Sequence, residues 1–419
     1  MAHSILELFP AGTTVDPDGT LRFAGCRVDD LAREFGTPAI VVDESALRAR
    51  AREYRDELAA RWPNARAVFA SKAFPATAVQ RVMVEEGLGL DVAGGGEILS
   101  ALRAGIDPAL LVMHGNAKTT EELQLAVDAG LGLVVVDNEN DVDRLEQLVP
   151  HGRRQNVLVR LVPGIESSTH AHVQTGQIGS KFGLTAAAAT QLIARIEASP
   201  KVTMRGVHAH VGSQIMDPAE LAAAVAPLAE LGEFPVYDLG GGLGARYTYD
   251  EHPASVAEYL DALIGAAHEH LPASAELIIE PGRSMVNGSA MTLYTVTTIK
   301  RDARNFVAID GGMGDNLEVA MFEQRYEGCL ATRMDEDAAE DAVIVGRHCE
   351  SGDVLIDPVR LPAPRVGDLL AVPNTGAYTH TMANNYNGYR RPPVVFAADG
   401  AARAVIRRET WEDLFAREV

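Results

Sequence analysis

Lys72 stands at the end of an apolar run, residues 67–71, and the residues that follow it are also uncharged. A partly buried lysine amine has a lowered pKa, which frees the amine to bond covalently to an aldehyde. An ordinary lysine is a solvated surface residue, so it is the setting of Lys72 that makes it a candidate catalyst. We expect its amine to be partly buried.

A glycine-rich turn and an acidic residue lie after two later apolar runs. The turn covers residues 238–244, and Glu280 and Arg283 follow the run at 276–281. Backbone amides of such a turn can approach a phosphate closely, and a carboxylate beside a pyridine nitrogen keeps that nitrogen protonated. With Lys72 for an aldehyde, the set predicts pyridoxal phosphate. Two simpler interpretations stay open, a plain tight turn for the glycines and an ion pair with Arg283 for Glu280.

His208 and His210 are two residues apart on one apolar run, so both side chains face the same side of a strand. One of the two rings could stack on a cofactor ring. A metal site is not expected, because no third ligand is placed beside the histidines by the sequence.

The elements that must position these residues form a series. Eight short runs rich in Val, Ile and Leu alternate with stretches of helical spacing, which predicts a closed (β/α)8 TIM barrel. In such a barrel the chemistry lies where the strands end. The ends carry Lys72, Asp91, His114, Asn116, Asp137, Arg160, His208, His210 and Glu280, and the runs are 66–72, 88–92, 110–115, 132–137, 156–162, 204–210, 236–241 and 276–281. Among the helical stretches are 75–86, 96–104, 120–129 and 219–231.

The length of the chain predicts a second domain. A TIM barrel uses about 250 residues, whereas this chain has 419. We place the barrel at 45–285 and a mainly β domain at 1–44 plus 286–419. Strand and turn signals support that domain at 39–42, 294–299, 306–309, 342–345, 369–372 and 393–396.

Charge and composition exclude several classes of partner. The net charge is −21 without a long block of one sign, which argues against nucleic acid and anionic membranes. No apolar stretch approaches the roughly 20 residues of a membrane span, and the N-terminal residues lack the pattern of a signal peptide. We expect a cytoplasmic protein. Its three cysteines have no metal-type spacing, so reduced thiols are expected.

The chain resembles the fold-type III pyridoxal-phosphate decarboxylases, and among them the diaminopimelate decarboxylases. The resemblance runs over nearly the whole chain and implies an alanine racemase-like barrel with a second, β-rich domain. The motifs that carry it are residues 70–74, 91–97, 114–118, 181–184, 208–214, 238–244, 280–284, 310–313, 349–353 and 375–378.

The resemblance also implies a role for each residue of the site. Lys72 bonds to the cofactor, His210 stacks on its ring and Glu280 meets the pyridine nitrogen. Cys349 assists protonation of the product and Glu350 touches the substrate, both from the second subunit of a homodimer whose sites are shared. The other residues implied in cofactor binding are Asp91, Ser213, Gly240, Gly241, Gly242, Gly282, Arg283 and Tyr378, of which Arg283 and Tyr378 also contact substrate.

One segment departs from the diaminopimelate pattern. In the diaminopimelate decarboxylases an arginine and a tyrosine of this segment bind the distal carboxylate of the substrate. In this chain Glu318 stands in place of the arginine and Phe322 in place of the tyrosine. A glutamate there repels a carboxylate and suits the cation of lysine, ornithine or arginine instead. Alternatively Glu318 turns away and Arg325 or Arg347 supplies the positive charge. We therefore expect an amino-acid decarboxylase, with meso-diaminopimelate or one of these amino acids as substrate.

The rival hypothesis from another class is a catalytically silent relative that binds the cofactor without turnover. Such a protein need not keep Lys72, His210, Glu280, Cys349 and Tyr378 together, and all five are present. The complete set therefore favours an enzyme.

Overall fold

The computed structural model describes residues 4–165, 176–177 and 179–419, which form two compact units. The first, the barrel unit, consists of Arg50–Gly244 and Pro253–Met285. The second, the β-rich unit, consists of Met1–Ala49, Ala245–His252 and Val286–Val419. Residues 245–252, which we had placed in the barrel, therefore belong with the β-rich unit. The reason is Tyr247, which is fully buried in the hydrophobic core of that unit with Tyr294 and Tyr326.

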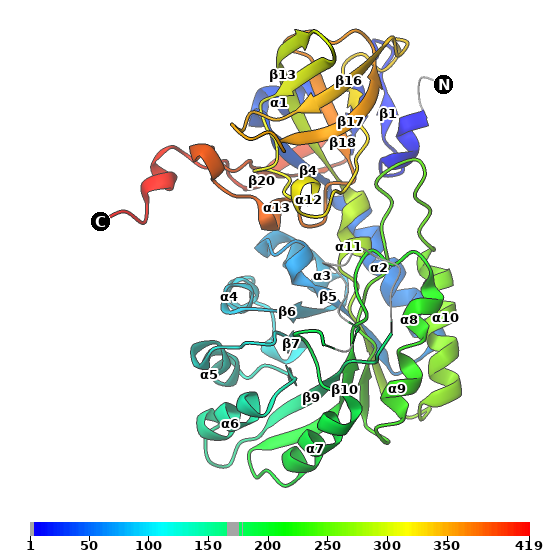
Figure 1. Cartoon of the computed structure of the whole chain (residues 1–419), viewed down its shortest axis with the longest axis vertical. Coiled ribbons are helices and arrows are strands. Elements are labelled where there is room, and N and C mark those ends of the chain that lie inside the picture. The colour runs from blue at the N-terminus through cyan, green and yellow to red at the C-terminus, as the bar shows by residue number, and fades with distance from the viewer. Residues whose placement is uncertain (1–3, 166–175, 178) are drawn as a thin grey trace. The chain divides into compact units, whose positions relative to one another are not determined.

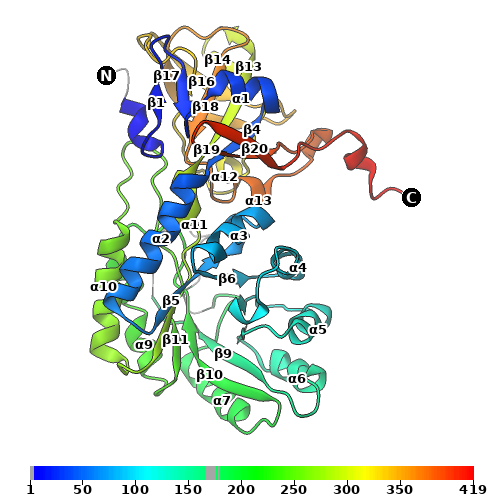
Figure 2. The same ribbon diagram turned by 180° about the vertical axis from the view of Figure 1, so that it is seen from behind.

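The barrel predicted from the sequence is confirmed. Eight parallel strands close on themselves in the order β10-β11-β12-β5-β6-β7-β8-β9. Figure 1 and the reverse view in Figure 2 show them with the helices α4 to α7 along the outside. The strands are β5 (Ala65–Ala70), β6 (Gly89–Val92), β7 (Leu111–Met113), β8 (Leu133–Val136), β9 (Gln155–Leu161), β10 (Val202–Ala209), β11 (Val236–Asp238) and β12 (Glu276–Ile279).

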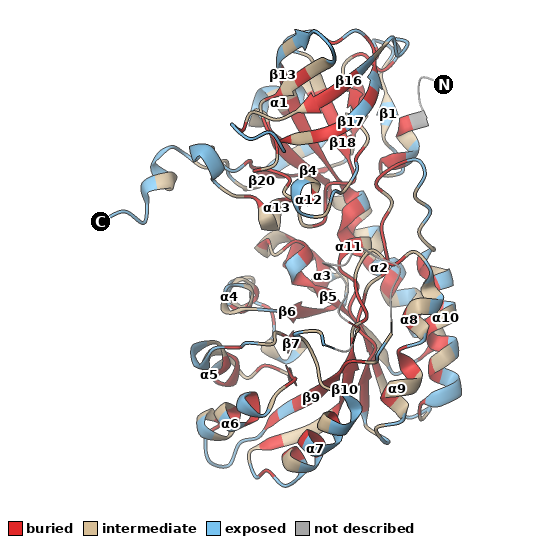
Figure 3. Ribbon diagram, viewed as in Figure 1, coloured by how far each residue is buried: buried red, intermediate tan, exposed pale blue. Residues whose placement is uncertain are grey.

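Apolar side chains on the strands form the core of the barrel. Val68, Val112, Leu158, Val236 and Ile278 are among its buried members. Figure 3 shows the strands as buried, while the outer helices present exposed surface. Because strands buried on both faces need apolar residues throughout, short uninterrupted apolar runs mark them in the sequence.

The helices of the barrel unit begin and end where the sequence provides caps. Thr119 and Glu122 form a capping box at α5, and Ser255 and Glu258 form another at α10. The helices are α2 (Glu44–Arg61), which starts in the β-rich unit, and α3 (Thr77–Glu85), α4 (Gly95–Arg103), α5 (Thr120–Ala129), α6 (Glu139–Leu148), α7 (Ala186–Glu197), α8 (Pro218–Ala222), α9 (Val225–Ala229), α10 (Val256–His270) and α11 (Arg283–Val286).

One predicted helix is broken in two. The stretch 219–231 forms α8 and α9 rather than one continuous helix. Pro227 lies in the first turn of α9, where its missing N–H group does no harm. In a continuous helix the same proline could not donate to the carbonyl four residues before it, so the helix restarts just ahead of it.

The second unit is mainly β, as expected. Its large sheet has the path β17-β16-β14-β13-β4-β19-β20, with β18 on β13 and β15 on β18, and a small sheet has the order β1-β2-β3. The strands are β1 (Thr14–Val15), β2 (Leu21–Phe23), β3 (Cys26–Arg27), β4 (Ala39–Asp43), β13 (Ala290–Arg301), β14 (Asn305–Ile309), β15 (Cys329–Leu330), β16 (Glu340–Val345), β17 (Val354–Leu361), β18 (Leu369–Pro373), β19 (Val394–Ala398) and β20 (Ala401–Ile406). Its helices are α1 (Val28–Phe35), α12 (Glu318–Met321) and α13 (Thr379–Met382).

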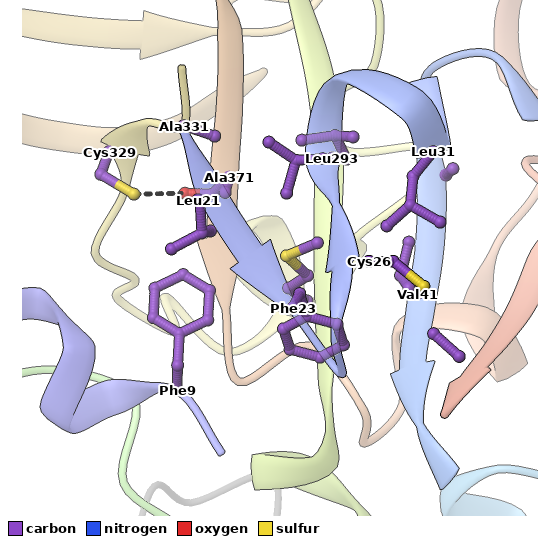
Figure 4. Close-up of a cluster of buried hydrophobic side chains, with 14 of the residues drawn as sticks. Phe9, Leu21, Phe23, Cys26, Leu31, Val41, Leu293, Cys329, Ala331 and Ala371 are labelled. Carbon is purple, nitrogen blue, oxygen red and sulfur yellow. Dashed lines mark hydrogen bonds between the residues drawn. The ribbon is translucent and has the colours of Figure 1, made fainter. Parts of the chain in front are cut away.

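Figure 4 shows one core of the β-rich unit. Phe9 meets Phe23 edge-on at 6.4 Å between ring centroids, and Cys26 and Cys329 lie in the same cluster. The Cys329 thiol points at the carbonyl of Ala371. All three cysteines are free thiols, two buried here and Cys349 exposed.

No helix among the described residues is long and apolar enough to cross a membrane.

Candidate active site

Glu280 is the centre of a buried cluster at the ends of the barrel strands. It follows β12, and its Oε2 lies 3.2 Å from Nε2 of His208, on β10. Its Oε1 lies 2.5 Å from Nε2 of His114, which follows β7, but in an orientation that makes no hydrogen bond. The rings of His114 and His208 meet edge-on at 4.9 Å. Parallel strands end at the same rim, which explains why residues so far apart in sequence meet here.

Of the two carboxyl groups Glu280 and Asp238, Glu280 is the one that is ionised. Burial raises the pKa of a carboxyl, but attraction to His114 and His208 holds the pKa of Glu280 well below its usual range. Burial and repulsion by Glu280 raise the pKa of Asp238 well above its usual range. Burial likewise lowers the pKa of His208 to about 4, so its ring is neutral at pH 7.

His208 does have further potential metal ligands beside it, contrary to the expectation from the sequence. Ligand atoms of His114, Asp238 and Glu280 accompany that of His208, and the four atoms, all on buried residues, lie within 4.8 Å of one another. The sequence could not place His114 and Glu280 beside His208, since 94 and 72 residues separate them from it. The choice between a metal and an organic cofactor therefore rests on the other groups at the rim.

His210 lies one residue beyond β10 and meets the glycine turn. Its Nδ1 accepts a hydrogen bond from the N–H of Gly241 at 3.3 Å, and burial lowers its pKa well below the usual range. The N–H of Gly240 donates to Oδ1 of Asp238 at 3.0 Å. Two of the three turn amides thus donate within the barrel.

The glycines of the turn are required by close backbone contacts. Gly240 and Gly242 have φ angles of +66° and +131°, which favour glycine. A Cβ on Gly241 would lie only 2.0 Å from the carbonyl oxygen of Glu280. The turn therefore fits tightly against the residue that carries the buried carboxylate.

A buried cation lies beside this turn. Arg283, after β12, donates from Nε to Oγ of Ser213 at 3.2 Å, and Ser213 follows β10. Arg283 is buried, while Ser213 is half-buried. A buried guanidinium with a hydroxyl next to it is a suitable partner for a phosphate. Gly282, which precedes the arginine, is buried as well.

Lys72 does not have the environment expected from the sequence. It lies in a short 3-10 helix, Ser71–Ala73, directly after β5, and it is exposed although Ser71 and Ala73 are buried. The expectation of a partly buried amine is wrong for this structure. The residue does lie at a strand end, with Asp91 buried at the end of the neighbouring strand β6.

The β-rich unit holds a second group of candidate residues in one turn. Cys349 and Glu350 are exposed between β16 and β17, and His348 before them is buried. Asp353 binds this turn, because its Oδ2 accepts hydrogen bonds from N of His348 at 2.8 Å and from Nδ1 at 3.0 Å. Tyr378, a further predicted site residue, is half-buried at a φ of +60°.

Glu318 turns into the core of the β-rich unit. It is 1% exposed, and its Oε2 accepts hydrogen bonds from the hydroxyls of Tyr326 at 3.0 Å and Tyr247 at 3.2 Å. The two tyrosine rings meet at 90° with 5.2 Å between centroids. Phe322, four residues on, is half-buried.

Arg325 and Arg347, which could supply the positive charge missing at position 318, differ in their surroundings. Arg325 is exposed and forms a surface ion pair with Asp250 at 2.8 Å. Arg347 is half-buried, and its guanidinium carbon lies 4.0 Å from the ring centroid of Tyr389. Of the two, only Arg347 lies in the turn that carries Cys349.

Some contacts of these sites were not predicted from the sequence. His114, His208 and Asp238 were recognised at strand ends but not as neighbours of Glu280, and Tyr247 and Tyr326 around Glu318 were missed altogether. The first three stand at strand ends, which was a usable signal. The two tyrosines carried none, since nothing in the local sequence relates residue 247 to residue 318.

Known proteins share both the sequence and the fold of this chain. Residues 44–287 match the family model of the pyridoxal-dependent decarboxylases, described as their pyridoxal binding domain. The chain belongs to this family. Diaminopimelate decarboxylase from Actinosynnema pretiosum is 42% identical over 98% of this chain and 95% of its own, and that from Halalkalibacterium halodurans is 40% identical over 97% of each. The crystal structure of diaminopimelate decarboxylase from M. jannaschii with L-lysine has a TM-score of 0.90, 30% identity and 98% coverage of each chain.

Membership of the family settles the class of reaction and the cofactor. The chain is a pyridoxal-phosphate-dependent amino-acid decarboxylase. The site fits that cofactor on its own chemistry, because Glu280 is a buried carboxylate whose pKa is held well below its usual range, and an ionised carboxylate is the acceptor that a protonated pyridine nitrogen needs. Arg283 with Ser213 fits the phosphate at the same rim.

Proposed function

We propose that this decarboxylase removes the α-carboxylate at the D-centre of meso-diaminopimelate and releases L-lysine. The observation that carries the proposal is full-length identity of about 40% to diaminopimelate decarboxylases from several bacteria. The orientation of Glu318 supports it as well, because a carboxylate bonded to two tyrosine hydroxyls does not project a charge against the distal carboxylate of the substrate.

The residues of the barrel divide the work of holding the cofactor. Lys72 would bond to its aldehyde, Glu280 would accept a hydrogen bond from its protonated ring nitrogen, and Ser213, Arg283 and the 240–242 turn would hold its phosphate. His210 would stack on the ring, and Asp91, at the end of β6, would complete the cofactor site. When bound, pyridoxal phosphate accepts the electrons released as carbon dioxide leaves. His114 and His208 keep Glu280 ionised, which maintains that capacity.

The β-rich unit supplies the groups that act on the substrate. Cys349 would return a proton to the product, Glu350 would contact the substrate, and Tyr378 would help to hold the phosphate. We propose that the subunits form a homodimer in which this unit serves the barrel of the partner.

A second candidate is a decarboxylase of lysine, ornithine or arginine. It is favoured by the loss of the arginine and tyrosine at positions 318 and 322, since a site without partners for a distal carboxylate discriminates poorly in its favour. The burial of Glu318 weighs against a direct contact with a substrate cation.

The two candidates differ in the substrate that releases carbon dioxide. The cofactor-loaded protein would be given meso-diaminopimelate, lysine, ornithine and arginine in parallel, and both carbon dioxide and amine product would be measured. We expect turnover of meso-diaminopimelate to L-lysine. Turnover of one of the other three alone would overturn the substrate proposed here and leave the reaction class intact.

A double variant tests whether positions 318 and 322 determine the substrate specificity. Glu318→Arg with Phe322→Tyr restores the family pattern, and Glu323→Arg, an exposed change in the same segment, is its control. A gain in kcat/KM on meso-diaminopimelate specific to the double variant would identify positions 318 and 322 as the determinants of specificity. A loss would show that burial of Glu318 by Tyr247 and Tyr326 is needed for the fold of the segment.

A further inference from the structure

The turn that carries Cys349 and Glu350 is fixed from its inner side by one carboxylate. Asp353 accepts hydrogen bonds from His348, as described above, and from N of Met313 at 2.6 Å. A Cβ on Gly312 or Gly346 would lie 2.5 Å or less from this carboxylate. The inner side of the turn is therefore closely packed and hydrogen-bonded to Asp353.

A second segment, residues 384–389, fixes the outer side of the same turn. Tyr386 stacks on His348 with the ring planes 6° apart, and its hydroxyl lies 3.5 Å from Oε2 of Glu350. The Tyr389 hydroxyl donates to the carbonyl of Arg347 at 3.0 Å. Each residue of the turn from 347 to 350 is thus contacted by the 384–389 segment.

Asn387 makes the contact to Cys349 itself. Its side-chain Oδ1 accepts a hydrogen bond from the backbone N–H of Cys349 at 2.9 Å. Asn387 has a φ of +54° and a ψ of +20°, a left-handed conformation that asparagine tolerates better than most residues. In this backbone conformation the side-chain amide of Asn387 points toward the backbone N–H of Cys349.

We propose that Asn387 is a positioning residue for Cys349. By holding the N–H of Cys349 it fixes the direction in which the thiol leaves the turn, while Asp353 holds the turn from beneath. This inference rests on the proposed function in one respect, the part that Cys349 takes in protonating the product. The geometry of the turn stands without it.

Two variants at this position separate the hydrogen bond from the backbone conformation. Asn387→Gly keeps the left-handed conformation accessible and removes the acceptor oxygen. Asn387→Asp keeps both the conformation and an acceptor oxygen, so it is the matched rescue. Cys349→Ser identifies the signal in a thiol titration with dithionitrobenzoate, because Cys26 and Cys329 are buried.

The first measurement is the rate of thiol modification, taken at the high-pH plateau so that the added charge of Asn387→Asp does not enter. We expect Asn387→Gly to raise that rate several-fold and Asn387→Asp to restore the wild-type rate. On the substrate found to turn over, Asn387→Gly should lower kcat by about tenfold, the scale of one hydrogen bond, with KM within about twofold. Thermal unfolding should be nearly unchanged.

Either of two results would overturn the proposal. One is a thiol rate and a kcat in Asn387→Gly equal to those of the wild type. The other is equal damage in Asn387→Asp and Asn387→Gly, which would show that the oxygen is not the relevant contact. If no amino acid tested is decarboxylated, the proposed function fails, and the thiol rates still decide the role of Asn387.

Discussion

At the scale of single residues, the site depends on one buried, ionised carboxylate that faces two histidine rings. Glu280 keeps its charge in a buried cluster because two imidazole rings face it, and the ring of His208 is neutral at pH 7 because its pKa is about 4. This arrangement makes the cluster sensitive to acid.

The pH dependence of stability should report the buried histidine. The pKa of His208 lies near 4 in the folded chain and near 6.5 in the unfolded chain. Between these values the unfolded state binds more protons, so the contribution of His208 to the free energy of unfolding falls as the pH falls. From pH 6.5 to 5 the loss is up to about 2 kcal/mol. Urea unfolding of wild type and His208→Asn at both pH values measures it.

The comparison with the variant is necessary because other groups oppose this trend. Burial raises the pKa of Glu97 to about 7, which makes its contribution to stability larger in acid. The wild type should lose more stability than His208→Asn between the two pH values. Equal losses would mean that His208 is already protonated in the folded protein.

The sequence allowed Lys72, Glu280 and the glycine turn to be predicted as site residues, because each follows an apolar run. It did not allow the orientation of Glu318 to be predicted. A carboxylate in place of an arginine was interpreted as facing the substrate, whereas Tyr247 and Tyr326 draw it into the core. Such an orientation is set by tertiary neighbours, which local patterns do not contain.

At the scale of elements, a buried ion pair connects the loop after β7 to α6. Lys118 Nζ lies 2.8 Å from Oδ2 of Asp141, with both side chains at most 1% exposed, and it donates to the carbonyl of Gly115 at 2.5 Å. His114, beside Glu280, precedes this loop. The pair therefore anchors the segment that carries His114, one of the two histidines beside Glu280.

Removal of the lysine should destabilise the barrel. Lys118→Met leaves the buried carboxylate of Asp141 with one fewer cation, and we expect a loss of about 3 kcal/mol in the free energy of unfolding. The control is Arg195→Gln, which breaks exposed pairs with Asp143 and Glu146 and should cost less than about 1 kcal/mol. Similar losses in the two variants would contradict an anchoring role for Lys118.

The close contact of a glycine in a barrel strand allows a second prediction about the stability of the elements. A Cβ on Gly206 in β10 would lie 1.8 Å from the carbonyl oxygen of Val236 in β11. Gly206→Ala should therefore separate the strands and cost about 3 kcal/mol. Gly265→Ala in α10, where a Cβ meets nothing within 4 Å, should stabilise by about 0.5–1 kcal/mol. Thermal unfolding distinguishes them, and a mild Gly206→Ala would mean that the strand shifts freely.

The elements themselves were largely predictable because a barrel strand needs an apolar run and a cap needs specific residues. Two details were not. The break between α8 and α9 depends on Pro227, and the assignment of residues 245–252 to the β-rich unit depends on where Tyr247 is buried. Both depend on packing that appears only once the chain is folded.

At the scale of the whole molecule, the candidate residues are divided between the two units. Lys72, His210 and Glu280 lie in the barrel unit, while Cys349, Glu350 and Tyr378 lie in the β-rich unit. We propose that the two sets act in one site, formed across a homodimer rather than within one subunit.

Mixed variants distinguish the two arrangements. Lys72→Ala and Cys349→Ala each lack one half of the site, and we expect both to be inactive alone. If sites are shared across a two-fold dimer, an equal mixture after subunit exchange should recover about a quarter of wild-type activity, from hybrid dimers with one intact site. A mixture that stays inactive, with exchange verified by native mass spectrometry, would place both sets in one subunit.

The location of the cofactor is the claim on which every proposed role depends. The most direct measurement is borohydride reduction of the cofactor-loaded protein, followed by peptide mass spectrometry, since the chain has only five lysines. We expect the reduced cofactor on the peptide that contains Lys72, and no label in Lys72→Ala. Label on Lys118, Lys181, Lys201 or Lys300 instead would contradict the site described here.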